Sequence, residues 1–282
     1  MKHLKGMGWT RDLPDFRDFT IHTPDVTGIR ARSKQLPRTT QAAPTGVDLR
    51  PWCSPIEDQG ELGSCTANAG VGLLEYFQRR AYGKHLDGSR LFLYKVTRRL
   101  LGWSGDQGAY LRTTMKAMAL FGLPPENYWA YDITQFDVEP PAFCYAFAQS
   151  YQALKYYRLD PAGQETPKTL AVLKENLAAG LPAMLGFTVY SSMPPLGDGK
   201  GEIPFPRPGD SVEGGHAVVA VGYDDQKQIE KDTGALLIRN SWSTAWGVAG
   251  YGWLPYSYVH AGLAVDFWSL VESRFTDTDL FA

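Results

Sequence analysis

Cysteine is scarce in this chain: only three of its 282 residues are cysteines, and none has the Cys-x-x-Cys spacing of zinc or redox sites. An odd number of cysteines cannot pair completely within one chain. We expect reduced thiols, no metal and no cofactor. The sequence alone leaves open a disulfide between Cys53 and Cys144.

Long apolar runs are also missing. No stretch approaches the roughly 20 apolar residues that a membrane-spanning helix needs. The first residues, MKHLK, are basic, but Arg11 and Asp12 follow before an apolar region of signal-peptide length can form. We therefore expect no membrane partner and a cytoplasmic location by default, with non-classical export as the open alternative.

Neither sign of charge is in large excess. The chain has 28 Lys and Arg residues against 30 Asp and Glu residues, mixed along its length, and a net charge of −2. Binding to nucleic acid or to an anionic membrane requires a basic surface, so we expect neither partner. With 44% hydrophobic residues, the chain can bury a substantial core as one large domain or as two packed lobes.

A glycine-rich turn leads into a predicted helix near residue 65. Residues 59–69 read QGELGSCTANA, and apolar side chains then recur every four residues. Cys65 thus begins a helix, where unpaired N–H groups and the helix dipole favour the nucleophilic thiolate. Gly60 and Gly63 allow a tight turn and leave room for a substrate carbonyl. Because a lone cysteine is more often a small buried apolar residue, partner residues must decide its role.

Two later segments supply such partners. Residues 214–223, GGHAVVAVGY, predict a buried strand with His216 near its start. Residues 236–242, LLIRNSW, predict a second strand that leads to Asn240 and Trp242. In this order the three segments resemble the motifs of the papain-like cysteine peptidases, whose catalytic residues are Cys, His and Asn.

The spacing of the three residues supports this resemblance. His216 follows Cys65 by 216 − 65 = 151 residues, and Asn240 follows it by 240 − 65 = 175. The family range is about 130–150 residues, so the asparagine comes somewhat late. The Gly- and Pro-rich residues 194–214 are the expected place of the added length.

The resemblance implies a role for each of these residues. Cys65 is expected to be the nucleophile and His216 the base, as a thiolate–imidazolium pair in which the pKa of the thiol falls well below about 8.5. Asn240 would orient the imidazole, and Trp242 would shield that hydrogen bond from water. The Gln59 amide and the Cys65 N–H would bind the oxyanion.

The resemblance and the room left by glycines also indicate a set of substrate-binding residues: Gly63, Gly108, Ala109, Gly215, Trp242 and Asp266. Asp266 falls near the pocket for the second residue before the scissile bond, where an acid would favour a basic side chain. The alternative for Asp266 is a structural acid at a strand end. For Gly108 and Ala109 it is the first turn of a helix.

Helical patterns dominate the first half of the chain and strand patterns the second. We expect an α+β, papain-like two-lobed fold, with a helical lobe over about residues 60–160, a β-barrel-like lobe over about 161–275, and the cleft between them. The peptidase domain would span residues 44–282. Residues 1–43 form an N-terminal extension that either packs on the surface or serves as a pro-segment, with Trp9, Phe16 and Phe19 as its anchors and a cleavable loop near residues 39–45.

Three departures from the usual family pattern are visible. Leu62 replaces a cysteine that is normally in a disulfide, Thr66 replaces a Trp, and Ser243 replaces a Gly. These departures resemble a bacterial branch of the family. We expect a monomeric cysteine peptidase that acts on a peptide or protein. A papain-fold amidase or transferase for non-peptide amides, and a non-catalytic peptide-binding relative, stay open as alternatives.

Overall fold

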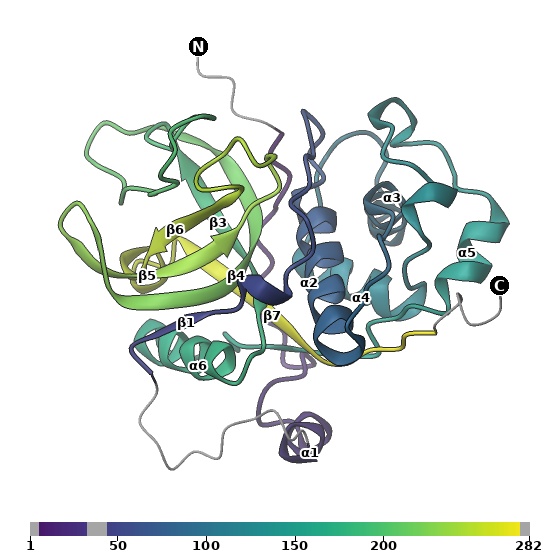
Figure 1. Cartoon of the computed structure of the whole chain (residues 1–282), viewed down its shortest axis with the longest axis horizontal. Helices are drawn as coiled ribbons and strands as arrows, with labels where there is room; N and C mark the ends of the chain where they lie inside the picture. The colour runs from purple at the N-terminus through teal and green to yellow at the C-terminus, as the bar shows by residue number, and fades with distance from the viewer. Residues whose placement is uncertain (1–5, 33–43, 277–282) are drawn as a thin grey trace.

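The structure is a computed structural model that describes residues 6–32 and 44–276. Figure 1 shows helices gathered on one side and a sheet on the other. The helical lobe contains α2 (Cys65–Tyr82), α3 (Arg90–Leu101), α4 (Leu111–Leu120) and α5 (Ala142–Ala148), with short 3₁₀ turns at Arg50–Trp52, Glu126–Tyr128 and Ile133–Gln135. The expected α+β class is confirmed.

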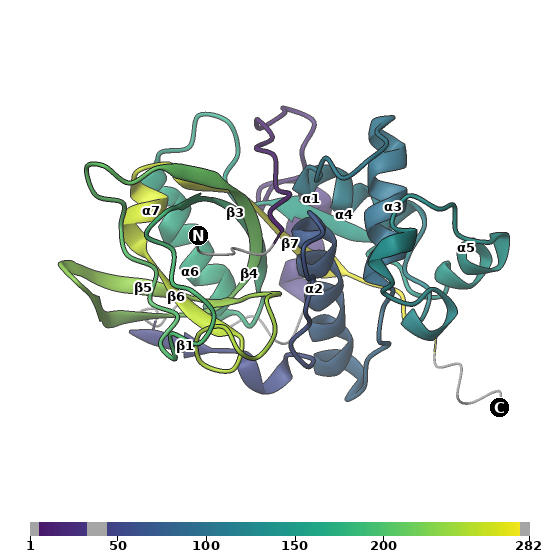
Figure 2. The same ribbon diagram turned by 90° about the horizontal axis from the view of Figure 1, so that it is seen from above.

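Within the described residues, seven strands form one antiparallel sheet in the order β2-β7-β3-β4-β5-β6, and β1 pairs with β4. The strands are β1 (Gly46–Asp48), β2 (Lys155–Arg158), β3 (Ala183–Tyr190), β4 (Val212–Ile229), β5 (Asp232–Arg239), β6 (Tyr251–Pro255) and β7 (Ala264–Glu272). The sheet is open, with β2 and β6 at its ends, so the expected barrel-like lobe is a curved open sheet (Figure 2). Helices α6 (Thr166–Ala178) and α7 (Tyr256–His260) pack on this lobe.

Helix α2 joins the two lobes, because it packs against α3 and α4 on one side and against β4 on the other. A glycine makes one close approach possible. A Cβ added to Gly72 of α2 would lie 2.1 Å from the guanidinium of Arg239, the last residue of β5. The helix that begins at Cys65 is therefore held directly against the strand that leads to Asn240.

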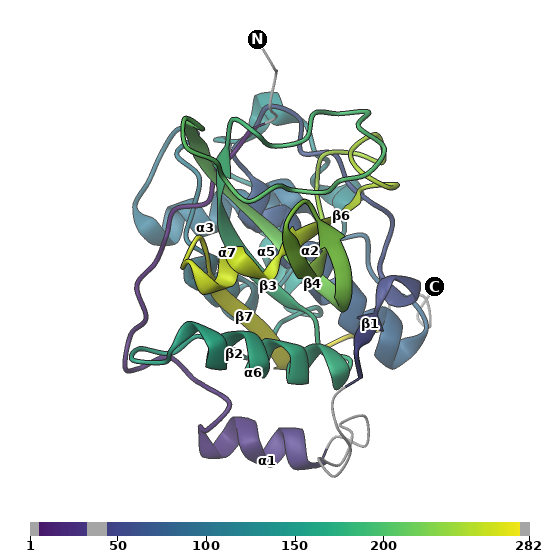
Figure 3. The same ribbon diagram turned by 90° about the vertical axis from the view of Figure 1, so that its left-hand side faces the viewer.

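The N-terminal segment, residues 6–32, runs between the two lobes and ends in α1 (Pro24–Arg32) below α6 (Figures 1 and 3). This helix has little amphipathic pattern in the sequence, and of residues 24–29 only Val26 is buried. No helix in the described part of the chain is both long enough and apolar enough to cross a membrane.

Candidate active site

Cys65 is the first residue of α2, and its side chain is fully buried. Its sulfur accepts a hydrogen bond from the backbone N–H of Gly8, at 3.3 Å. Burial raises the pKa of the Cys65 thiol to about 11, and backbone hydrogen bonds from Ala217 and Gly8 offset this only in part. The expected lowered pKa is therefore wrong for this form of the protein, because the thiol is fully buried.

His216 lies on β4 and is also fully buried. Its Nε2 donates to the Asn240 Oδ1 at 2.7 Å, the contact that the sequence predicts. Its Nδ1 is buried and has no hydrogen-bond partner among the described residues. Burial lowers the pKa of His216 to about 4, against the opposing effect of the Asn240 hydrogen bond. In this form both the imidazole and the thiol are neutral at pH 7.

Trp242 lies behind this imidazole, with the two ring centroids 4.5 Å apart, and packs edge-on against Trp246. Only 1% of its surface is exposed. Trp242 thus packs against the His216 ring and is buried in this form of the protein.

The Gln59 side chain is held in one orientation by Ser241. The Ser241 hydroxyl donates to the Gln59 Oε1 at 2.6 Å, and the Gln59 backbone N–H donates to the Ser241 carbonyl at 2.9 Å. The amide nitrogen must therefore point away from Ser241, where it donates to the carbonyls of Gly6, at 2.7 Å, and Leu62. Sequence reasoning missed this role of Ser241, although its place beside Asn240 in the Asn-Ser-Trp motif was a signal.

Two surfaces that the sequence assigns to substrate bind the N-terminal segment instead. The Trp9 N–H donates to the Gly215 carbonyl, and the Thr10 N–H donates to the Ala109 carbonyl, both at 3.1 Å. The Ala109 N–H in turn donates to the Gly8 carbonyl at 2.7 Å. Residues 6–10 thus lie between the helical lobe and the sheet, and they occupy the cleft that runs past Cys65.

Glycines at the cleft wall make this close approach possible. A Cβ on Gly108 would lie 2.0 Å from the Gly8 carbonyl oxygen, and a Cβ on Gly8 would lie 1.7 Å from the carbonyl oxygen of Gly63. Four of the expected substrate-binding residues, Gly63, Gly108, Ala109 and Gly215, therefore lie together along the segment.

The indole of Trp9 fills a pocket that Asp266 closes. The indole N–H donates to the Asp266 Oδ2 at 3.2 Å. The other carboxylate oxygen accepts from Trp268, at 2.8 Å, and pairs with Arg158, at 3.1 Å. Burial raises the pKa of Asp266 to about 6, although Arg158 opposes this shift. Asp266 thus lies beside the Trp9 indole, and its carboxylate already has an internal cation in Arg158.

The segment is not placed for cleavage. A substrate must present a carbonyl carbon to the sulfur, whereas here the sulfur meets the N–H of Gly8. The carbonyl at the Gln59 amide belongs to Gly6, two residues earlier in the chain. The segment therefore contacts the Cys65 sulfur and the Gln59 amide without offering a scissile bond.

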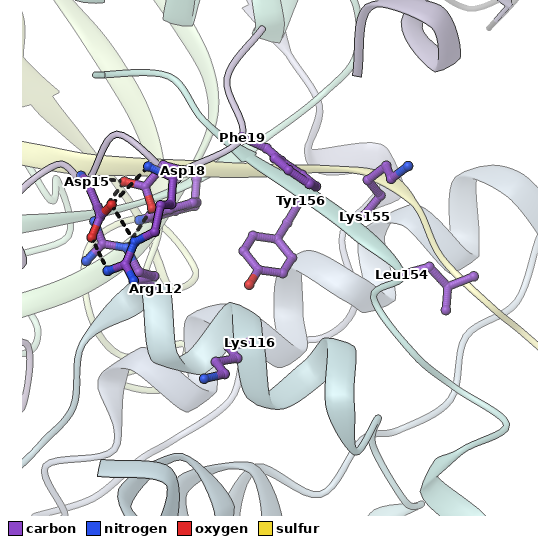
Figure 4. Close-up of a pocket in the computed structure, with 10 residues that line it drawn as sticks. Asp15, Asp18, Phe19, Arg112, Lys116, Leu154, Lys155 and Tyr156 are labelled. Carbon is purple, nitrogen blue, oxygen red and sulfur yellow. Dashed lines mark hydrogen bonds and ion pairs between the residues drawn. The ribbon is translucent and has the colours of Figure 1, made fainter. Parts of the chain in front are cut away.

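Ion pairs hold the next part of the segment on the helical lobe. Arg112 of α4 donates to Asp18 at 2.7 Å and also to Asp12. Figure 4 shows the contact between Arg112 and Asp18, which both line a cavity of about 340 Å³. Of the aromatic anchors expected from the sequence, Trp9 is 8% exposed, but Phe16 is 94% and Phe19 45% exposed. Two of the three predicted anchors are wrong, and carboxylates serve in their place.

A thiol at a helix start, a histidine–asparagine pair and an amide donor between two lobes define the class of cysteine hydrolases. The sequence profile of the papain family cysteine proteases matches residues 43–266. The chain belongs to this family and is a cysteine peptidase. Members of the family act on peptide or protein substrates.

Several known proteins are similar to this chain. Xylellain, a cysteine protease from Xylella fastidiosa, is 32% identical, with a TM-score of 0.75 and 98% of each chain covered. The peptidase C1-like protein L477 of Acanthamoeba polyphaga mimivirus is 32% identical over 95% of this chain and 87% of its own length. Gallus gallus cathepsin K is 30% identical over 80% of this chain and 65% of its own. The expected similarity to a bacterial branch is confirmed.

Proposed function

We propose that Cys65, His216, Asn240 and Gln59 catalyse peptide-bond hydrolysis, and that residues 6–10 restrain this activity by occupying the cleft. Support for the catalytic roles comes from the orientation of the imidazole. Asn240 engages Nε2, which leaves Nδ1 as the nitrogen available to Cys65. Support for the restraint comes from the contacts of the segment with Cys65 and Gln59.

In the proposed mechanism, His216 takes the thiol proton and the Cys65 sulfur attacks the peptide carbonyl carbon. The oxyanion accepts hydrogen bonds from the Gln59 Nε2 and the Cys65 N–H. His216 then gives its proton to the leaving amine, and a water molecule hydrolyses the cysteine acyl-enzyme. Withdrawal of the segment would readmit water, which lowers the cost of charging both groups and lets the thiolate–imidazolium pair form.

The single observation that carries the restraint is that the Gly8 N–H and the Gly6 carbonyl occupy the sulfur and the oxyanion donor at once. A tethered segment has an effective concentration in about the millimolar range, so modest intrinsic affinity is enough for high occupancy. Residues 1–43 would thus be a pro-segment and residues 44–282 the peptidase domain. The boundary between them, and most of the expected cleavable loop, lie outside the described residues.

Hydrolysis of a panel of fluorogenic peptides by the full-length protein tests the catalytic roles. Cys65→Ala should abolish turnover. Cys53→Ala is the matched control, because Cys53 is another buried free thiol, and it should retain turnover. Turnover that persists in Cys65→Ala would contradict the proposal. Cleavage of non-peptide amides only, or peptide binding without cleavage, would favour the alternative functions.

A further inference from the structure

The pocket that holds the Trp9 indole is built from Gly186, Gly215 and Asp266. We propose that this pocket selects a tryptophan side chain of the substrate, next to the residue at Cys65, with the Asp266 carboxylate as the acceptor of the indole N–H. This inference rests on the proposed function, because it assigns the pocket to substrate once the segment has withdrawn. It differs from the expectation of a basic side chain.

The pocket has the shape of an indole because two glycines form its walls. A Cβ on Gly186 of β3 would lie 1.9 Å from the Trp9 Cε2, and a Cβ on Gly215 would lie 2.8 Å from its Cε3. Any other residue at either position would collide with the ring. The space is available to a substrate side chain whichever way the substrate backbone runs, since it depends only on the walls.

A β-bulge directs the acceptor into this space. Asp266 has a φ of +67°, which is costly for a residue with a side chain, and the pairing of β3 with β7 shifts register between Met184 and Gly186. The backbone N–H groups of Asp266 and Phe267 both donate to Asp160, at 2.7 and 2.9 Å, which holds the bulge in place. The strained backbone thus places a carboxylate oxygen at the indole N–H.

The charges around Asp266 explain why a cation is not favoured. Arg158 pairs with both Asp266 and Asp160, at 3.1 and 3.0 Å, and Arg112 lies with Arg158 against the Trp268 ring. Withdrawal of the segment removes Asp12 and Asp18 from these arginines. The charges of the two arginines then balance those of Asp160 and Asp266. A substrate Lys or Arg would therefore find no net negative charge in the pocket, and it would be repelled by the adjacent guanidinium of Arg158. A neutral N–H donor keeps its hydrogen bond without that repulsion.

Binding to an inactive full chain that carries Cys65→Ala and Trp9→Gly tests this inference. Three acetylated tetrapeptides are titrated by calorimetry, with tryptophan, its sulfur isostere 3-benzothienylalanine, or arginine as the variable residue. The tryptophan peptide should bind tightest. The isostere should bind about tenfold or more weakly, because it leaves the buried Oδ2 of Asp266 without its hydrogen bond, and the arginine peptide should also bind more weakly.

Equal binding of tryptophan and its isostere would overturn the role of Asp266. Equal or tighter binding of the arginine peptide, or no binding of the tryptophan peptide, would overturn the selection itself. Adding Gly186→Ala provides a second check. It should weaken binding of the tryptophan peptide at least tenfold, whereas binding of a fourth tetrapeptide, with alanine as the variable residue, should not change. None of these readouts needs Cys65, so failure of the catalytic assignment would appear separately, as absent hydrolysis by the unsubstituted protein.

Discussion

At the scale of single residues, burial decides the state of the catalytic groups. The pKa of Cys65 is raised to about 11 and that of His216 is lowered to about 4, so both are neutral between these values. A position at a helix start is not enough to make a thiolate when the thiol is fully buried. The reactivity of Cys65 therefore reports directly whether the segment is in place.

The alkylation of Cys65 by iodoacetamide should depend steeply on pH in the full-length protein. The thiolate fraction rises with pH up to the pKa, so a pKa of about 11 predicts a rate that rises about tenfold per pH unit from 7 to 10. Mass spectrometry of the Cys65 peptide measures this rate. A plateau below pH 9 would show that the thiol is already ionised in this form.

Gln59→Ala should lower kcat, because the loss of one oxyanion donor raises the activation free energy by about 2.7–4 kcal/mol. The readout is kcat at saturating substrate, because Gln59 also binds Gly6 of the segment. Ser241→Ala should cost less, since it loses the orientation of the amide but keeps the donor. Gln107→Ala, at an exposed glutamine, is the control. An unchanged kcat in Gln59→Ala would remove Gln59 from the mechanism.

At the scale of elements, local patterns account for most of the fold. The helix expected to begin at Cys65 matches α2, and the strand expected at residues 214–223 lies within β4, because periodic apolar positions follow Gly-containing turns. The motifs also predict the contact between His216 and Asn240. Each of these predictions rests on short-range patterns or on a family resemblance.

The position of the N-terminal segment was beyond such reasoning. Trp9 and Phe16 are both aromatic residues in a polar stretch, yet one is buried and the other almost fully exposed. What buries Trp9 is contact with Asp266, Gly186 and Gly215, residues far away in the sequence. The expected lowering of the Cys65 pKa is wrong for the same reason, because no sequence motif shows which distant residues bury the thiol.

Gly8→Ala should release the segment from the cleft. Its added methyl group would lie 1.7 Å from the backbone oxygen of Gly63, which cannot move away as a flexible side chain can. We expect kcat/KM for peptide substrates to rise tenfold or more. Gly28→Ala is the matched control in the same segment, because a Cβ there meets nothing within 4 Å, and it should leave kcat/KM unchanged. Equal kcat/KM in Gly8→Ala and the unsubstituted protein would count against the restraint.

At the scale of the whole molecule, the segment lies between the two lobes and contacts both. The helical lobe contributes Cys65 and Ala109, the sheet contributes His216 and Gly215, and the segment between them makes hydrogen bonds to both sides. A substrate would compete for the same backbone groups. Under the proposed restraint, a single displacement of the segment would both open the cleft and permit ionisation of Cys65 and His216.

The most direct test of this account is the kcat/KM of full-length Trp9→Ala against full-length Phe16→Ala. Truncating a buried tryptophan removes about 3–5 kcal/mol of packing, more than enough for a hundredfold loss of segment occupancy. The account predicts at least a tenfold rise in kcat/KM for Trp9→Ala. It predicts no change for Phe16→Ala, whose side chain is 94% exposed. Equal kcat/KM in a folded Trp9→Ala variant and the unsubstituted protein would show that residues 6–10 do not restrain the enzyme.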